Sequence, residues 1–137
     1  MEEPFAEACG GVAVVKQLGE VSVSRILGVP VAEVRGEVDL SNAGPIGLEI
    51  RRGIANDDPG AVVDLSALTY LDSSGVRLLF ELEAQLSARR QRLCIAVPPE
   101  VRVRDILRIT RVHERVAVRD TVPEAVAAVL QGPAIRW

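Results

Sequence analysis

The sequence predicts one α/β domain, built as a mixed β-sheet with about four helices packed on it. Short apolar runs alternate with helical periodicities after Val38, a pattern typical of a partly parallel sheet. Two alternating segments before Val38, separated by a glycine, predict an antiparallel hairpin that opens the sheet. The chain has 137 residues, 48% of them hydrophobic, which is enough for one core.

The hairpin is predicted at residues 21–26 and 29–38, where apolar and polar side chains alternate. Residues 1–20 show no clear period, apart from a short strand candidate at 12–15, and we expect them to be an N-terminal extension that is disordered in part. The domain itself is expected to cover residues 21–131, followed by a tail at 132–137.

A weak helix is predicted at residues 45–56, with Pro45 in its first turn. Gly47 and Gly53 each cost a helix about 1 kcal/mol relative to alanine. This helix must therefore depend on packing against the rest of the domain.

The second half of the chain alternates apolar strands with amphipathic helices. A central strand is expected from residue 61 to Leu71 and leads directly into a helix at 74–90, whose sheet-facing stripe contains Gly75, Leu79, Leu82 and Leu86. The later elements are a buried strand at 93–97, a helix at 100–109, a strand at 116–118 and a final helix that begins after the capping residue Thr121.

The junction between the central strand and its helix reads Asp72-Ser73-Ser74-Gly75. A helix start carries unpaired backbone N–H groups and the positive end of the helix dipole, so it favours a hydroxyl or a phosphate. The alternative is a simple capped turn, because Asp and Ser are common N-cap residues.

The run from Val62 to Val76 that contains this junction resembles the STAS domain of bacterial anti-sigma factor antagonists. The resemblance covers about residues 21–130 and implies a STAS-like single domain. It implies a cytoplasmic regulator of transcription that binds an anti-sigma factor serine kinase, releases the sigma factor and is switched off by phosphorylation. The alternative function is a STAS module that acts as a scaffold or regulator in a stress-signalling or transporter-associated complex.

The resemblance also implies roles for residues of the junction. It selects Ser74 as the phosphorylated hydroxyl, although the sequence by itself leaves Ser73 open, and it adds a phosphatase that acts on phosphorylated Ser74. Asp39 corresponds to an aspartate near the acceptor, with an N-cap of the 45–56 helix as its alternative, and Asp72 is either part of this environment or only a cap. Gly75 is expected to let the kinase approach closely.

Two segments are expected to form the partner-binding surface. One is the loop from Asp39 to Pro45, and the other is the exposed part of the first two turns of the 74–90 helix. The residues named for this surface are Ser41, Asn42, Val76, Arg77, Phe80 and Glu81.

Composition and motifs exclude other classes of function. A net charge of −3 argues against a general nucleic-acid binder, and the basic stretch from Arg89 to Arg119 is read as a solvated face or a site for an acidic partner. No segment predicts a membrane span or a secretory signal, and two cysteines give no disulfide framework, so we expect a reduced, cytoplasmic protein. Phosphate-binding loops are absent and His113 is the only histidine, so no enzyme activity, cofactor or metal is expected.

Overall fold

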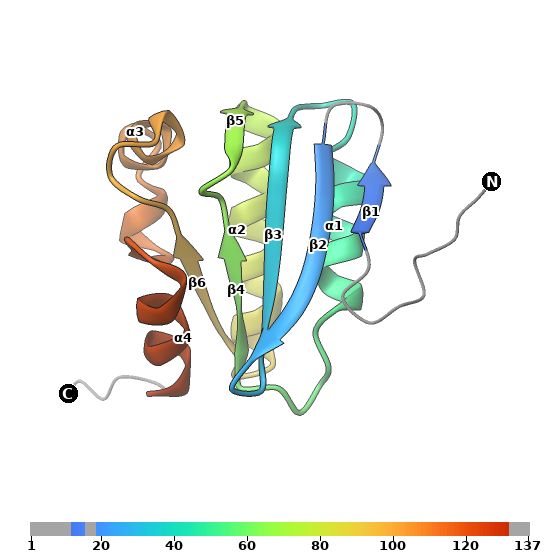
Figure 1. The fold of residues 1–137 in the computed structure, drawn as a ribbon, viewed down its shortest axis with the longest axis vertical. Helices are drawn as coiled ribbons and strands as arrows, with labels where there is room; N and C mark the ends of the chain where they lie inside the picture. Colours follow the sequence, from blue (N-terminus) through green and yellow to red (C-terminus); the bar gives the residue numbers. More distant parts are fainter. Residues whose placement is uncertain (1–11, 16–18, 132–137) are drawn as a thin grey trace.

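Seven strands and four α-helices are formed by the residues that the computed structural model describes, 12–15 and 19–131 (Figure 1). The strands are β1 (Val12–Val15), β2 (Gly19–Ile26), β3 (Val29–Val38), β4 (Gly60–Asp64), β5 (Leu68–Leu71), β6 (Arg92–Ala96) and β7 (Ala117–Arg119). The helices are α1 (Ala43–Arg52), α2 (Ser73–Ala88), α3 (Arg102–Ile109) and α4 (Val122–Leu130), with a short 3-10 helix η2 (Val112–Glu114). The predicted fold class, a mixed sheet with about four helices, is confirmed.

The sheet has the strand order β1-β2-β3-β4-β6-β7. β2 is antiparallel to both β1 and β3, whereas β3, β4, β6 and β7 are parallel. β5 pairs with β3 beyond the part of β3 that pairs with β4, so β4 and β5 lie end to end along one edge of β3. The strand predicted to run unbroken from residue 61 to Leu71 is therefore interrupted at residues 65–67.

Helices cover both faces of the sheet. α4 packs on one face, where Val126 and Val129 belong to the same buried cluster as Val62 of β4. α1, α2 and α3 share the other face, and the larger core there includes Val63, the next residue of β4. This division follows from the strand geometry, because successive side chains of a strand point to opposite faces.

α1 occupies residues 43–52 instead of the predicted 45–56. Gly53 follows its last turn, and the Gly53 N–H donates to the carbonyl of Ile50. The other glycine, Gly47, is buried against α2, and a Cβ at this position would overlap Leu78 Cδ1. Gly47 therefore lowers the helix propensity of α1 but allows α1 to approach α2 closely.

The range predicted as an N-terminal extension falls only partly within the described residues. Its described part includes β1, which pairs with β2 from Val12↔Ser22 to Val15↔Gly19. Residues 1–11, 16–18 and the tail at 132–137 lie outside the described residues. Among the helices of the described chain, none is long and apolar enough to cross a membrane.

Candidate functional site

The ends of β3 and β5 bring the predicted site residues to one edge of the sheet. The backbone N–H of Asp72 donates to the carbonyl of Val38 at 3.2 Å. The turn that starts α2 therefore lies beside the loop that follows β3, although 34 positions separate Asp72 from Val38 in the sequence. The predicted neighbourhood of Ser74 and the Asp39 loop arises from this strand pairing.

Asp72 is the N-cap of α2. Its Oδ1 accepts hydrogen bonds from the backbone N–H groups of Ser74 at 2.8 Å and Gly75 at 3.2 Å. Of the two alternatives that the sequence left open for this junction, the capped turn describes these two N–H donors, because the Asp72 carboxylate already occupies them. The cap instead fixes the backbone that carries both serines.

Ser73 and Ser74 differ in their surroundings. Ser73 is the first residue of α2 and is exposed, whereas Ser74 is half-buried. Ser74 lines a hollow of about 180 Å³ between α1, α2 and the loop before α1, which we call the Ser74 hollow. The residues that line it are Leu40, Ala43, Gly44, Arg51, Ser74, Arg77, Leu78 and Glu81.

Asp39 is held within its own loop. Its Oδ1 accepts hydrogen bonds from the Ser41 N–H at 2.9 Å and the Ser41 hydroxyl at 2.6 Å. Asn42, and not Asp39, precedes the first residue of α1. The Asp39 carbonyl accepts from the backbone N–H groups of Asn42 and Ala43, so the backbone of Asp39, and not its carboxylate, contributes to the start of α1.

Asn42 is fully buried, at 0% exposure. Its amide accepts from the Asp39 N–H at 2.9 Å and donates to the Glu37 carbonyl at 3.0 Å. The prediction that Asn42 lies on the partner-binding surface is corrected by this burial, because the amide satisfies the backbone of the loop from the inside. Ser41 is exposed in the same loop.

Gly75 also has a different role from the one predicted. It is buried, and a Cβ at this position would overlap Leu71 Cδ1 and lie 3.1 Å from Val38 Cγ1. Gly75 thus faces the core, where it lets α2 begin close to β3 and β5. The burial of Gly75 against Leu71 and Val38 does not support the expectation that it lets a kinase approach closely.

A family model described as STAS domain matches residues 20–125. The chain belongs to the STAS domain family. No curated protein matches its sequence.

Solved structures with the same fold include several anti-sigma factor antagonists. An anti-sigma factor antagonist from Mycobacterium paratuberculosis is 25% identical, with a TM-score of 0.73 over 82% of this chain and 94% of that one. The unphosphorylated anti-sigma factor antagonist SpoIIAA is 21% identical, with a TM-score of 0.65 over 83% of this chain and 99% of that one. The murine anion transporter Slc26a9 is 15% identical, with a TM-score of 0.66 over 80% of this chain and 19% of that one.

The exposed surface of the STAS domain around Ser74 combines charged and apolar side chains. Arg77 and Glu81 are exposed on α2, and their side chains lie 3.6 Å apart. Leu40, at 82% exposure, projects from the β3–α1 loop into the rim of the Ser74 hollow. Sequence reasoning did not single out Leu40, since a leucine in a loop gives no signal of its exposure.

Two α2 residues of the predicted surface lie largely inside. Val76 is only 8% exposed and belongs to the core, so its predicted place on the partner-binding surface is corrected. Phe80 is half-buried against the core, and the guanidinium carbon of Arg115 lies 4.9 Å from its ring centroid. Neither residue lines the Ser74 hollow.

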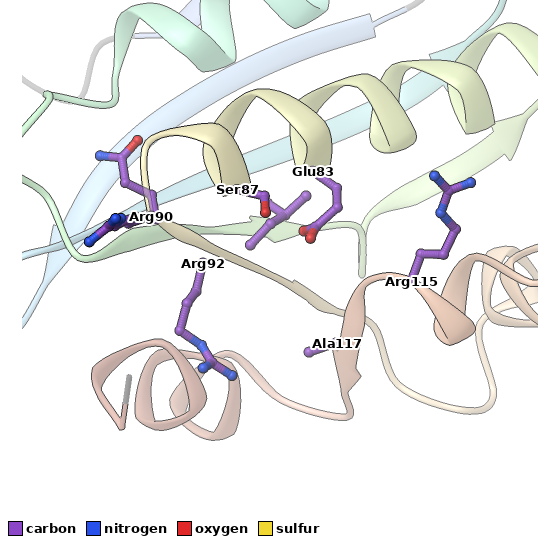
Figure 2. A pocket seen from close by; sticks show the side chains of 8 residues that line it. Glu83, Ser87, Arg90, Arg92, Arg115 and Ala117 are labelled. Atoms are coloured by element: carbon purple, nitrogen blue, oxygen red, sulfur yellow. The ribbon is translucent and has the colours of Figure 1, made fainter. Parts of the chain in front are cut away.

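A second hollow of the STAS domain, of about 420 Å³, lies at the opposite end of α2 (Figure 2). Burial raises the pKa of Glu83 in this hollow, and the charges of Arg92 and Arg115 partly oppose that rise. Figure 2 shows the guanidinium groups of Arg90, Arg92 and Arg115 pointing in different directions, so they do not converge on one anion. Within the described residues, no group of three or more His, Cys, Asp or Glu side chains is placed to hold a metal ion.

Proposed function

We propose that this STAS domain is an anti-sigma factor antagonist that binds an anti-sigma factor serine kinase and is switched off by phosphorylation of Ser74. In its unphosphorylated form it would capture the kinase and so release the sigma factor. The support comes from the likeness to anti-sigma factor antagonists together with the position of Ser74. Ser74 lines a surface hollow and stands on a backbone that Asp72 holds in place.

The proposed modification requires little of the domain itself. The Ser74 Oγ attacks the γ-phosphorus of ATP, the bond from that phosphorus to the β–γ bridging oxygen breaks, and ADP leaves. The hydroxyl proton passes to a base of the kinase. The antagonist contributes a serine in a fixed position, and the kinase supplies the catalytic groups.

Phosphorylation would act on the complex more than on the fold. A phosphoserine carries a charge of about −1.5 to −2 at pH 7, and Ser74 is half-buried at the surface and belongs to neither core cluster. A dianion in the middle of an interface must be desolvated, and this opposes binding. A phosphatase acting on phosphorylated Ser74 would restore the active form, and we place this cycle in the cytoplasm.

The decisive experiment is intact mass spectrometry after incubation with ATP and the anti-sigma kinase encoded nearest to this protein. We expect a gain of one phosphate in the wild type and in Ser73→Ala, and no gain in Ser74→Ala. A phosphate that persists in Ser74→Ala and disappears in Ser73→Ala would show that Ser73, and not Ser74, is the modified residue. No phosphate in any variant, with the kinase active on another substrate, would reject the proposed switch.

The second candidate is a STAS module that serves as a scaffold or regulator in a stress-signalling or transporter-associated complex. The observation that favours it is the likeness to part of Slc26a9, which concerns the fold alone. Stable binding to a partner that ATP and the kinase do not reverse would support this candidate over the first.

A further inference from the structure

We propose that Arg51 and Arg77 form a clamp that holds the phosphate of phosphorylated Ser74 inside the Ser74 hollow. This inference rests on the proposed modification of Ser74 and assigns the residues that receive the new charge. Both arginines line the same hollow as Ser74, and they come from different helices. An anion between them would link α1 to α2.

Arg51 reaches the hollow from α1. A Cβ at Gly47 would lie 3.4 and 3.5 Å from its two terminal nitrogens, so the guanidinium folds back over the preceding turn of its own helix. The present partner of Arg51 is neutral, since its Nη1 donates to the Gln85 Oε1 at 3.3 Å. A phosphate dianion is a much stronger acceptor than this amide, because charge-assisted hydrogen bonds are about twice as strong as neutral ones.

Arg77 reaches the hollow from α2. It lies three residues after Ser74, a spacing at which two side chains are neighbours on a helix surface. Its present partner is Glu81, at 3.6 Å, and the two side chains are 79% and 58% exposed. Such an exposed ion pair contributes little to stability, so Arg77 can exchange Glu81 for a phosphate at little cost.

The arginines, and not the backbone N–H groups of Ser74 and Gly75, are the groups that we assign to the phosphate. The N–H groups of Ser74 and Gly75 are bonded to Asp72. The acidic groups near the site are Asp72, Asp39 and Glu81. Asp72 and Asp39 already accept short hydrogen bonds, and Glu81 loses its own partner when Arg77 turns to the phosphate.

The clamp changes what a partner meets at this surface. Before modification, Arg51 and Arg77 present two cations beside the exposed Leu40. After modification, the phosphate draws both guanidinium groups inward and fills the hollow. The partner then meets a surface on which two positive charges are already paired with the phosphate.

The test uses phosphoserine incorporated genetically at position 74 of the full chain, so it does not depend on any kinase. The second pKa of phosphoserine is about 6, and two nearby cations favour the dianion. We expect phosphorus NMR titration to give a pKa of about 5 in the wild-type background, with Arg51→Gln and Arg77→Gln each moving it back toward 6. Arg52→Gln is the matched control, because Arg52 pairs with Glu49 on α1 and does not line the hollow.

A second control places phosphoserine at the exposed position 73, which does not line the hollow, and there we expect Arg51→Gln to leave the pKa unchanged. A pKa of about 6 at position 74, or a lowered value that either Arg51→Gln or Arg77→Gln leaves unchanged, would overturn the clamp. Failure of the kinase to modify Ser74, combined with a lowered pKa of the incorporated phosphoserine, would instead reject the proposed function and keep the clamp.

Discussion

Leu71 at the end of β5 fills the space that a side chain on Gly75 would need. A Cβ added at Gly75 would lie 3.0 Å from Leu71 Cγ and would overlap its Cδ1. Because Gly75 has no side chain, the start of α2 can pack directly against Leu71 of the sheet.

This contact predicts that Gly75→Ala is destabilising, by about 1 to 3 kcal/mol, the usual cost of overpacking a core. The measurement is urea denaturation of the variant and the wild type. Gly44→Ala is the control, because a Cβ there meets nothing within 4 Å, and it should be neutral or slightly stabilising. A Gly75→Ala variant as stable as the wild type would show that α2 can shift freely on β5.

Removing the helix cap of α2 should affect both the stability of the domain and the rate of Ser74 phosphorylation, whereas removing the cap of α4 should affect stability alone. Asp72→Ala should cost about 0.5 to 2 kcal/mol and slow the modification of Ser74, because the acceptor backbone is no longer held. Thr121→Ala removes the cap of α4, whose Oγ1 accepts from the Glu124 N–H at 3.2 Å, and should cost a similar amount without slowing modification. Equal phosphorylation rates for the two variants would argue against a positioning role for Asp72.

Leu40 should contribute to partner binding but not to folding, since 82% of its surface is exposed. We expect Leu40→Ser to weaken binding of the anti-sigma kinase about tenfold, or about 1.4 kcal/mol, with an unchanged denaturation midpoint. Leu27→Ser is the control, because Leu27 is 79% exposed in the turn at the other end of β3. Calorimetric titration in which both variants bind like the wild type would place the interface elsewhere.

The ion pair between Arg25 and Asp58 predicts a pH dependence of stability. Arg25 Nη1 and Nη2 donate to Asp58 Oδ1 at 2.8 Å and Oδ2 at 3.0 Å, and these hydrogen bonds lower the pKa of Asp58. A lowered folded pKa gives stability that is present above the unfolded pKa, about 3.9, and is lost as the pH falls through the folded value. Asp58→Asn should therefore be less stable by about 1 to 2 kcal/mol at pH 7, and its difference from the wild type should shrink below pH 4.

Glu83 predicts a pH dependence of stability opposite in sign to that of Asp58. Burial raises its pKa, so the protonated form is favoured in the folded state and its stabilisation is lost as the pH rises through the raised folded value. Glu83→Gln should gain stability relative to the wild type between pH 4 and pH 7. The measurement is thermal denaturation across this range. A difference in stability between Glu83→Gln and the wild type that does not change with pH would contradict the raised pKa of Glu83.

The sequence was sufficient for those features that depend on local periodicity. The stripe of Gly75, Leu79, Leu82 and Leu86 in the predicted 74–90 helix is the buried side of α2. The hairpin and the parallel strands also follow from alternation and from apolar runs. These patterns report which side of an element is buried, and this is decided mainly by neighbours within the same element.

The features that the sequence missed depend on contacts between distant elements. Within an isolated helix, Gly47 and Gly75 would only lower helix stability. In the fold they are needed because a side chain at either position would overlap Leu78 or Leu71, respectively. Asn42 follows Ser41 in a polar loop, yet it is buried because its amide bonds to the Glu37 carbonyl behind it. No local pattern could distinguish these two adjacent polar residues.

The break between β4 and β5 also makes the two strands differ in local stability. β4 is paired on both sides, by β3 and β6, whereas the four residues of β5 pair with β3 alone among the described strands. Regions with fewer hydrogen-bonded neighbours open at lower free energy and exchange their amide hydrogens sooner. The amide hydrogens of β5, the strand that leads into α2, should therefore exchange sooner than those of β4.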